Sequence, residues 1–551
     1  MNQDTFWTKP MYEKGGLDHL GVQAPNKALY AELLPGITNV TERLRYYSFY
    51  PWFFHTFHTC ERFALDDTQV ITFLRRAECL LTLIAHRHNH TGNGPAPSQH
   101  IKAMVGSNTL GPALNALDSD HTLRLSHFAD PKAEKSYFQN LKGGLGQYYF
   151  STLASYGFFE GDLKKLKCVV SNISPLAKSF ASDESSELFF QTLNKDEFDL
   201  NRLDQLASFC FCQLRQSASE QKQLTNLLFA TTASSAKSFA GYRPASLSLI
   251  LHWIDGATKV ENPNLASLAF RAQCYANATQ DQQPWNLPSS LERIREGWAL
   301  YEQSELLAMA MQGLFQFALS AIDSVSSEGV RFSNSGQFAE WLFTQEIWQE
   351  LYEDIDQKSF SLILEEEEPT LPGLLEWQAK NHECQLAIEL TSNLELEQLL
   401  ETALDLLLAI AIRAKQNNST NLPADSQFSL EDRRSYSLSL GNFLKLVFVD
   451  WAAMTFQQVV KELLTRWTLD CHLQVALIKM AQYGQDTFRL KPTEFGLLVD
   501  VDRIPTPVFT NPRFEPSRQF LVDLGLIETN SDQMIGISLA AEQILSKWRN
   551  E

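Results

Sequence analysis

Apolar residues recur at intervals of three and four along most of this chain, the spacing that places them on one face of an α-helix. The longest such stretches predict helices over residues 68–86, 291–322, 394–415 and 455–480. Strand-like runs are few and short, at 168–173 and 535–538, and 443–449 fits either structure. The pattern therefore predicts a mainly α protein.

Turn-forming and charged residues interrupt this pattern at 91–97, 280–288, 365–372 and 416–429. A chain of 551 residues exceeds what one hydrophobic core normally supports, so we expect two to four domains. We predict a multi-domain helical protein with two winged-helix-like modules. The expected divisions are an N-terminal helical domain 1–130, a first module 131–185, a helical middle region 186–480 and a second module 481–551.

The segment 33–54 combines a turn, a helix-start signal and a dense aromatic run. Asn39 lies three residues before Glu42, which is the spacing of a capping box. A helix is expected from about Val40 to Tyr50, with Pro51 ending it.

Arg43 and Arg45 of this segment have two interpretations. They could contact phosphate or a protein partner at the surface, and on that basis both are candidate nucleic-acid contacts. Alternatively, they belong to an aromatic core helix and pair internally. Aromatic density usually accompanies burial, which favours the internal interpretation.

One sequence pattern occurs twice. Residues 153–160 (LASYGFFE) align with 521–528 (LVDLGLIE), and 173–177 align with 537–541. Each copy predicts a helix that ends at a glycine, two strands joined by a polar loop, and a serine-capped closing helix. This order is that of the second half of a winged-helix domain.

The two copies differ in charge. The first polar loop carries lysines that suit phosphate contact, whereas the second, 529–533, has none, so we expect it to contact protein or to pack. The lysines of the first copy are Lys164, Lys165 and Lys167, with Lys142 upstream. The preceding helix could present polar side chains to bases or sugars: Gln147, Tyr148, Tyr149, Ser151 and Thr152.

Net charge and cysteine usage limit the function classes. A formal charge of -19 and a sequence pI near 5.2 argue against a protein that binds nucleic acid over its whole surface. They still allow a confined basic patch. The N-terminus lacks a secretion signal, and no apolar run reaches membrane-spanning length. Eight scattered cysteines without a CxxC pair are typical of reduced thiols, so a cytoplasmic protein is expected.

Catalytic motifs are weak. His86 and His90 share a helix face with Glu78 and could hold a metal, but a solvated histidine-rich helix end is favoured. The glycine-rich run 142–146 lacks the context of a phosphate loop. Carboxylates at 353–356 and 500–502 could bind Mg²⁺ only if they converge. We therefore assign no catalytic residue, no metal ligand and no cofactor.

Three segments, 16–34, 33–54 and 297–318, resemble a group of uncharacterised bacterial proteins often encoded among antiphage defence genes beside helicases and nucleases. The resemblance implies work within a multi-subunit defence assembly and brings no catalytic residue. The leading hypothesis is a non-catalytic scaffold that binds DNA weakly alone and recruits a helicase or nuclease subunit, with no membrane partner. The alternatives are a metal-dependent nuclease or phosphodiesterase, and a winged-helix transcriptional regulator.

Overall fold

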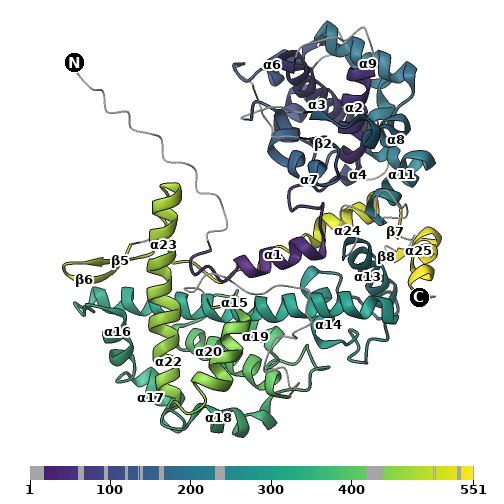
Figure 1. The fold of residues 1–551 in the computed structure, drawn as a ribbon. Coiled ribbons are helices and arrows are strands. Elements are labelled where there is room, and N and C mark those ends of the chain that lie inside the picture. The colour runs from purple at the N-terminus through teal and green to yellow at the C-terminus, as the bar shows by residue number, and fades with distance from the viewer. Residues whose placement is uncertain are drawn as a thin grey trace, which may run out of the picture. The chain divides into compact units, whose positions relative to one another are not determined.

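Helices dominate the computed structural model of this chain (Figure 1), as the apolar pattern predicts. The structure describes residues 18–59, 67–91, 97–117, 122–133, 136, 140–160, 167–229, 242–416, 438–500, 502, 504–529 and 535–549. Within these residues the named strands form four separate two-stranded antiparallel sheets. The mainly α prediction is confirmed.

The chain forms two compact units, each assembled from segments that are far apart in sequence. Unit 1 comprises 1–32, 268–286 and 295–510, and unit 2 comprises 33–267, 287–294 and 511–551. The four consecutive domains expected from the sequence stay a prediction. Residues from 511 onward belong to the same unit as the N-terminal helical region.

Unit 1 is built around one long helix, α15. Its elements, with their full bounds, are α1 (Ala24–Leu33), α14 (Ser267–Ala276), α15 (Ser289–Ser327), α16 (Ser335–Leu342), α17 (Glu346–Tyr352), α18 (Phe360–Glu366), η5 (Glu368–Thr370), α19 (Glu383–Glu389), α20 (Leu396–Gln416), α21 (Leu440–Lys445), η6 (Leu446–Asp450), α22 (Phe456–Leu464), η7 (Thr465–Leu469), α23 (Asp470–Tyr483), β5 (Leu490–Thr493) and β6 (Gly496–Val499). By length and composition α15 could cross a membrane, but 83% of its most apolar window is buried inside the protein. That burial is the pattern of a core helix.

Several buried polar side chains of unit 1 pair with one another. The Arg271 guanidinium donates to Glu302 at 2.6 Å, and it lies over the ring of Tyr301. Asn26 of α1 donates to Glu305 of α15 at 2.6 Å. Because a buried polar group without a partner is costly, these contacts fix how α1 and α14 meet the long helix.

Unit 2 contains the remaining helices and hairpins. Its helices are α2 (Tyr46–Thr59), α3 (Asp67–His90), α4 (Pro97–His100), α5 (Ser107–Asn115), α6 (Ser126–Ala129), η2 (Leu145–Tyr149), α7 (Phe150–Ser155), α8 (Val170–Phe180), α9 (Asp183–Lys195), α10 (Leu200–Gln205), η3 (Ala207–Phe209), η4 (Phe211–Gln216), α11 (Ala218–Phe229), α13 (Tyr242–Ala257), α24 (Phe514–Asp523) and α25 (Leu539–Arg549). Its strands are β1 (Leu123–Arg124) with β4 (Glu197–Phe198), β2 (Phe159–Glu160) with β3 (Lys167–Cys168), and β7 (Ile527–Thr529) with β8 (Ile535–Ile537).

Helix α2 supplies the aromatic core of unit 2. Trp52 is 2% exposed, and its ring lies 5.1–5.6 Å from the rings of four phenylalanines on neighbouring elements. The predicted boundaries of this helix are wrong, since it begins at Tyr46 and continues through Pro51 to Thr59. The Asn39 side chain donates to the Asn511 carbonyl instead of capping. The backbone N–H of Leu44 is bonded by the Asp523 carboxylate, a partner that local spacing could not reveal.

The four long predicted helices are present in α3, α15, α20 and the α22–α23 pair. Of the strand-like runs, 535–538 is confirmed by β8, whereas 168–173 is strand only at Cys168, because α8 begins at Val170. The run 443–449, which fitted either structure, is helical.

The repeated sequence pattern corresponds to repeated geometry. Gly157 and Gly525 both adopt a positive φ, of 72° and 69°, after α7 and α24. In each copy the glycine N–H bonds the carbonyl three residues back, and the next N–H bonds the carbonyl five residues back. This is the Schellman arrangement, in which glycine avoids the penalty of the left-handed conformation. The predicted glycine helix ends are confirmed.

The downstream half of the sequence alignment is wrong by five residues. Val169 bonds the Phe158 carbonyl as Ser538 bonds that of Leu526, so these positions are equivalent. The predicted serine cap is present in the second copy, where Ser538 accepts from the Ala541 N–H. In the first copy Ser174 lies inside α8, and Val169 at the helix start offers no side-chain cap.

Candidate functional site

The helix of the first copy exposes a polar face and buries an apolar one. Gln147 in η2 and Ser151 in α7 are exposed and lie one turn apart, and Tyr148 is half-buried. Tyr149 and Thr152, also expected to reach nucleic acid, are 1% and 3% exposed. Only part of the predicted set is therefore available to a partner, because the other side chains of this helix pack inward.

A buried carboxylate holds the start of this helix. Glu78 of α3, which is fully buried, accepts from the backbone N–H groups of Gly144 at 2.9 Å and Leu145 at 2.8 Å. The Tyr50 hydroxyl donates to the same carboxylate at 2.8 Å. An anionic group at a helix N-terminus satisfies otherwise unpaired donors and the helix dipole. The glycine-rich run is therefore the docking point of Glu78.

Glycine is required where Glu78 approaches. Gly143 has a φ of 62°, and a Cβ atom there would lie 2.3 Å from Glu78 Oε2. Desolvation by burial raises the pKa of Glu78 to about 7, although the three donors favour the ionised form. The exposed face of the helix is thus positioned by a carboxylate that titrates near neutral pH.

Four lysines near this helix in the sequence are predicted to contact DNA, and the structure describes only part of this set. Lys142, one residue before the glycines, is partly exposed, and its backbone N–H is bonded by Asn140. Lys167 pairs in register with Glu160 in the β2–β3 hairpin. Lys164 and Lys165, and the side chain of Lys167, lie outside the described residues.

The second copy uses its polar groups within unit 2. Asp523 at the end of α24 accepts from the Leu44 N–H at 3.1 Å and lies 3.4 Å from Arg43 Nε. Arg513 donates to the Leu34 carbonyl at 2.8 Å. Strand β8 and helix α25 pack against α13. These contacts are packing within the chain, one of the two roles expected for this copy.

Arg43 and Arg45 face the interior of unit 2 and do not form a surface. They are 1% and 2% exposed. Arg43 donates to the carbonyls of Gln99 and Lys102 at 2.8 and 2.9 Å. The internal interpretation therefore replaces the surface one, because both guanidinium groups are buried and bond backbone carbonyls and carboxylates of the chain itself.

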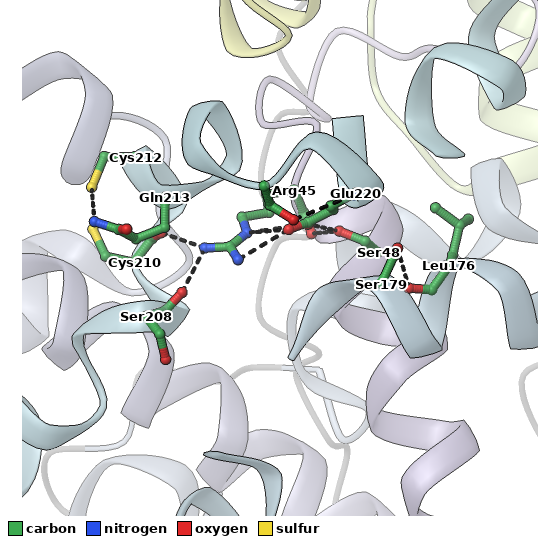
Figure 2. Close-up of polar contacts among 10 residues, drawn as sticks. Arg45, Ser48, Leu176, Ser179, Ser208, Cys210, Cys212, Gln213 and Glu220 are labelled. Carbon is green, nitrogen blue, oxygen red and sulfur yellow. Dashed lines mark hydrogen bonds and ion pairs between the residues drawn. The ribbon is translucent and has the colours of Figure 1, made fainter. Parts of the chain in front are cut away.

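Arg45 contacts both helix α11 and the connection between η3 and η4 (Figure 2). Its guanidinium makes a forked contact with the buried Glu220 carboxylate, with N–O distances of 3.0–3.2 Å. On its other side it donates to the carbonyls of Ser208 and Cys210. Charge-assisted forked bonds of this kind fix both geometry and position.

Close to these arginines, two histidines and two cysteines converge. The side-chain donor atoms of His88, His100, Cys210 and Cys212 all lie within 4.8 Å of one another. Nδ1 of His100 is 3.3 Å from Sγ of Cys210, and Nδ1 of His88 is 3.3 Å from Sγ of Cys212. Sequence reasoning missed this set, although the two cysteines are the closest pair in the chain, because His100 and Cys210 lie 110 positions apart.

The metal candidates weighed from the sequence do not join this cluster. His86 bonds Ser107 at 2.8 Å, and burial lowers its pKa. Glu78 binds the glycine-rich run instead of facing the histidines. Among the residues the structure describes, the carboxylates at 353–356 and 500–502 belong to no group with metal-ligand geometry.

Comparisons with known proteins give no relative for this chain: no family model, no curated protein and no solved structure matches it.

Proposed function

We propose that this chain is a non-catalytic subunit of a bacterial defence complex, in which the first helix–hairpin–helix copy contacts DNA and other surfaces hold protein subunits. The observation that carries the proposal is the exposed Gln147–Ser151 face beside a lysine-bearing hairpin. In winged-helix proteins such a helix meets a groove of the duplex, and basic residues on the hairpin meet phosphate.

Several features support a binding role over an enzymatic one. The N-terminus of the exposed helix is bonded by Glu78, which in turn accepts a hydrogen bond from Tyr50. The acidic clusters at 353–356 and 500–502 lack convergence among the described residues. The resemblance of three segments to defence-associated proteins supplies the proposed cytoplasmic setting and the helicase or nuclease partner.

The proposal is tested with the full chain and a fluorescent DNA duplex, by anisotropy at several salt concentrations. Wild type is expected to bind with Kd of roughly 10⁻⁴–10⁻⁶ M at physiological salt. The triple variant Lys164→Glu, Lys165→Glu and Lys167→Glu should weaken binding and flatten the salt dependence. Each lost phosphate contact removes about 0.9 from the slope of log K against log salt.

A matched control makes the same charge change elsewhere. Lys222, Lys259 and Lys380 are exposed, so replacing all three with glutamate alters net charge equally without touching the hairpin. If both triple variants weaken binding alike, net charge alone acts, and the hairpin is not the contact.

Point variants suit this test better than truncation. Removing residues from 511 onward would take away Asp523, which bonds the start of α2, and would uncover α13. Such a truncation would perturb the fold of unit 2. Recruitment of partners is better tested by co-purification with the intact chain, where capture of an ATPase or nuclease supports the scaffold role.

A further inference from the structure

The histidine–cysteine cluster is assembled from three separate stretches of unit 2. His88 lies near the end of α3, His100 ends α4, and the cysteines flank the start of η4. His100, Cys210 and Cys212 are buried, at 1%, 0% and 6% exposure, and His88 is half-buried. Separate stretches of unit 2 therefore bring four side-chain atoms of the kinds that bind metal ions to one place.

The donor set selects the class of metal. Two thiol sulfurs and two imidazole nitrogens form the tetrahedral S₂N₂ set that suits Zn²⁺, whereas Mg²⁺ and Ca²⁺ require oxygen ligands. With zinc–sulfur and zinc–nitrogen bonds of about 2.3 and 2.0 Å, neighbouring ligands lie about 3.5 Å apart. The two sulfur–nitrogen distances of 3.3 Å are close to this spacing, and all four donor atoms lie within 4.8 Å of one another.

The loops that carry the ligands are held from behind. Arg43 donates to the carbonyls of Gln99 and Lys102, which flank His100. Its guanidinium also lies 5.1 Å from the ring centre of Phe211, the residue between the two cysteines. Metal sites depend on such outer contacts, because these contacts orient the direct ligands.

Arg45 and Gln213 act on the cysteine side (Figure 2). Arg45 donates to the carbonyls of Ser208 and Cys210, and Glu220 anchors its guanidinium. The Gln213 amide donates to Sγ of Cys212 at 3.5 Å. A donor directed at a sulfur stabilises its thiolate, the form that binds metal.

We propose that His88, His100, Cys210 and Cys212 bind one Zn²⁺ ion and that this ion has a structural role in unit 2. Binding releases the two thiol protons to solvent, and the four protein ligands leave no coordination position for a substrate. The ion would cross-link α3, α4 and the η3–η4 connection, which are far apart in the sequence. The assignment is independent of DNA binding.

The test is metal analysis of the full chain, purified without chelator, by inductively coupled plasma mass spectrometry. One zinc per chain is expected. Cys212→Ser should reduce the zinc content to near zero, whereas Cys212→His, which keeps a zinc-binding donor, should retain part of it. Cys168→Ser and His127→Ala are the controls, because these residues lie outside the cluster and should keep full zinc content.

A second measurement covers variants that fail to fold. Replacing the metal of the wild-type chain with Co²⁺ should give the visible absorption of a tetrahedral site with thiolate ligands. Removing the metal with a chelator should lower the thermal unfolding midpoint of unit 2, and added Zn²⁺ should restore it.

Three results would overturn the assignment. One is a metal-free wild-type chain that takes up neither Zn²⁺ nor Co²⁺. Another is full zinc content in Cys212→Ser, which would place the ion elsewhere. The third is a Cys210–Cys212 disulfide in the freshly purified chain, detected as the loss of two hydrogens by mass spectrometry, which would identify a redox pair instead.

Discussion

Replacement of Glu78 by glutamine tests whether a buried carboxylate controls the helix of the proposed DNA contact. Its carboxylate is fully buried, and desolvation raises its pKa from 4.5 to about 7. Below pH 4.5 the group is protonated in both folded and unfolded chains. Between pH 4.5 and about pH 7 the carboxyl holds its proton in the folded chain but loses it in the unfolded chain. The free energy of unfolding therefore falls as pH rises through this range.

The size of the effect follows from the shift. At about 1.4 kcal/mol per pKa unit, moving from 4.5 to about 7 corresponds to about 3 kcal/mol of stability lost across this window. Glutamine resembles the protonated acid and does not titrate. The free-energy difference between wild type and Glu78→Gln should therefore change by about this amount between pH 5 and pH 8, in favour of the variant.

Hydrogen exchange of the Gly144 and Leu145 amides, followed from pH 5 to pH 8, reports the local effect, and thermal unfolding reports the global one. Measuring differences between two chains removes the titration of other groups. A constant difference across the range would refute the reasoning. It would mean that the two helix amides and the Tyr50 hydroxyl outweigh desolvation and keep the carboxylate ionised.

Further predictions concern the interior of unit 2. Arg45→Met should cost about 3–5 kcal/mol by leaving the Glu220 charge buried and unpaired, whereas adding Glu220→Leu should recover much of the loss in a double-mutant cycle. Denaturant unfolding of the four chains checks this, and strict additivity would contradict it. Gly525→Ala places its Cβ in open space and should cost only about 1–2 kcal/mol for the left-handed conformation. Gly143→Ala also meets a buried carboxylate and should cost at least about 2 kcal/mol more, so equal thermal shifts would count against the docking role of this glycine.

The spacing of apolar residues was enough to predict the long helices, because residues three and four positions apart form the apolar face of a helix. The helices α15 and α20 appear where the pattern placed them. The helix ends at Gly157 and Gly525 were also predicted correctly, because the positive φ that favours glycine there is set by the local backbone. Both kinds of signal are contained within a few residues of sequence.

Features decided by distant partners could not be predicted in the same way. Just before α2, the backbone N–H of Leu44 donates a hydrogen bond to Asp523, which lies 479 positions away in the sequence. The glycine-rich run resembled a phosphate loop because both bind an anion with backbone amides, but here the anion is the side chain of Glu78. The proposed zinc ligands likewise come together only after folding, because His100 and Cys210 lie 110 positions apart in the sequence.

The opening segment shows why a binding motif and an internal anchor look alike in sequence. Both need arginines, whose forked donors can hold several oxygens at once, beside aromatic rings that stack on the guanidinium. Arg43 and Arg45 use this capacity on backbone carbonyls of the two loops that carry the proposed zinc ligands and on two acidic side chains. Burying two guanidinium groups has a large desolvation cost, which is offset only where every donor has a fixed partner. Such fixed partners hold the proposed zinc ligands in place, so loss of either arginine should weaken zinc retention even though neither touches the ion.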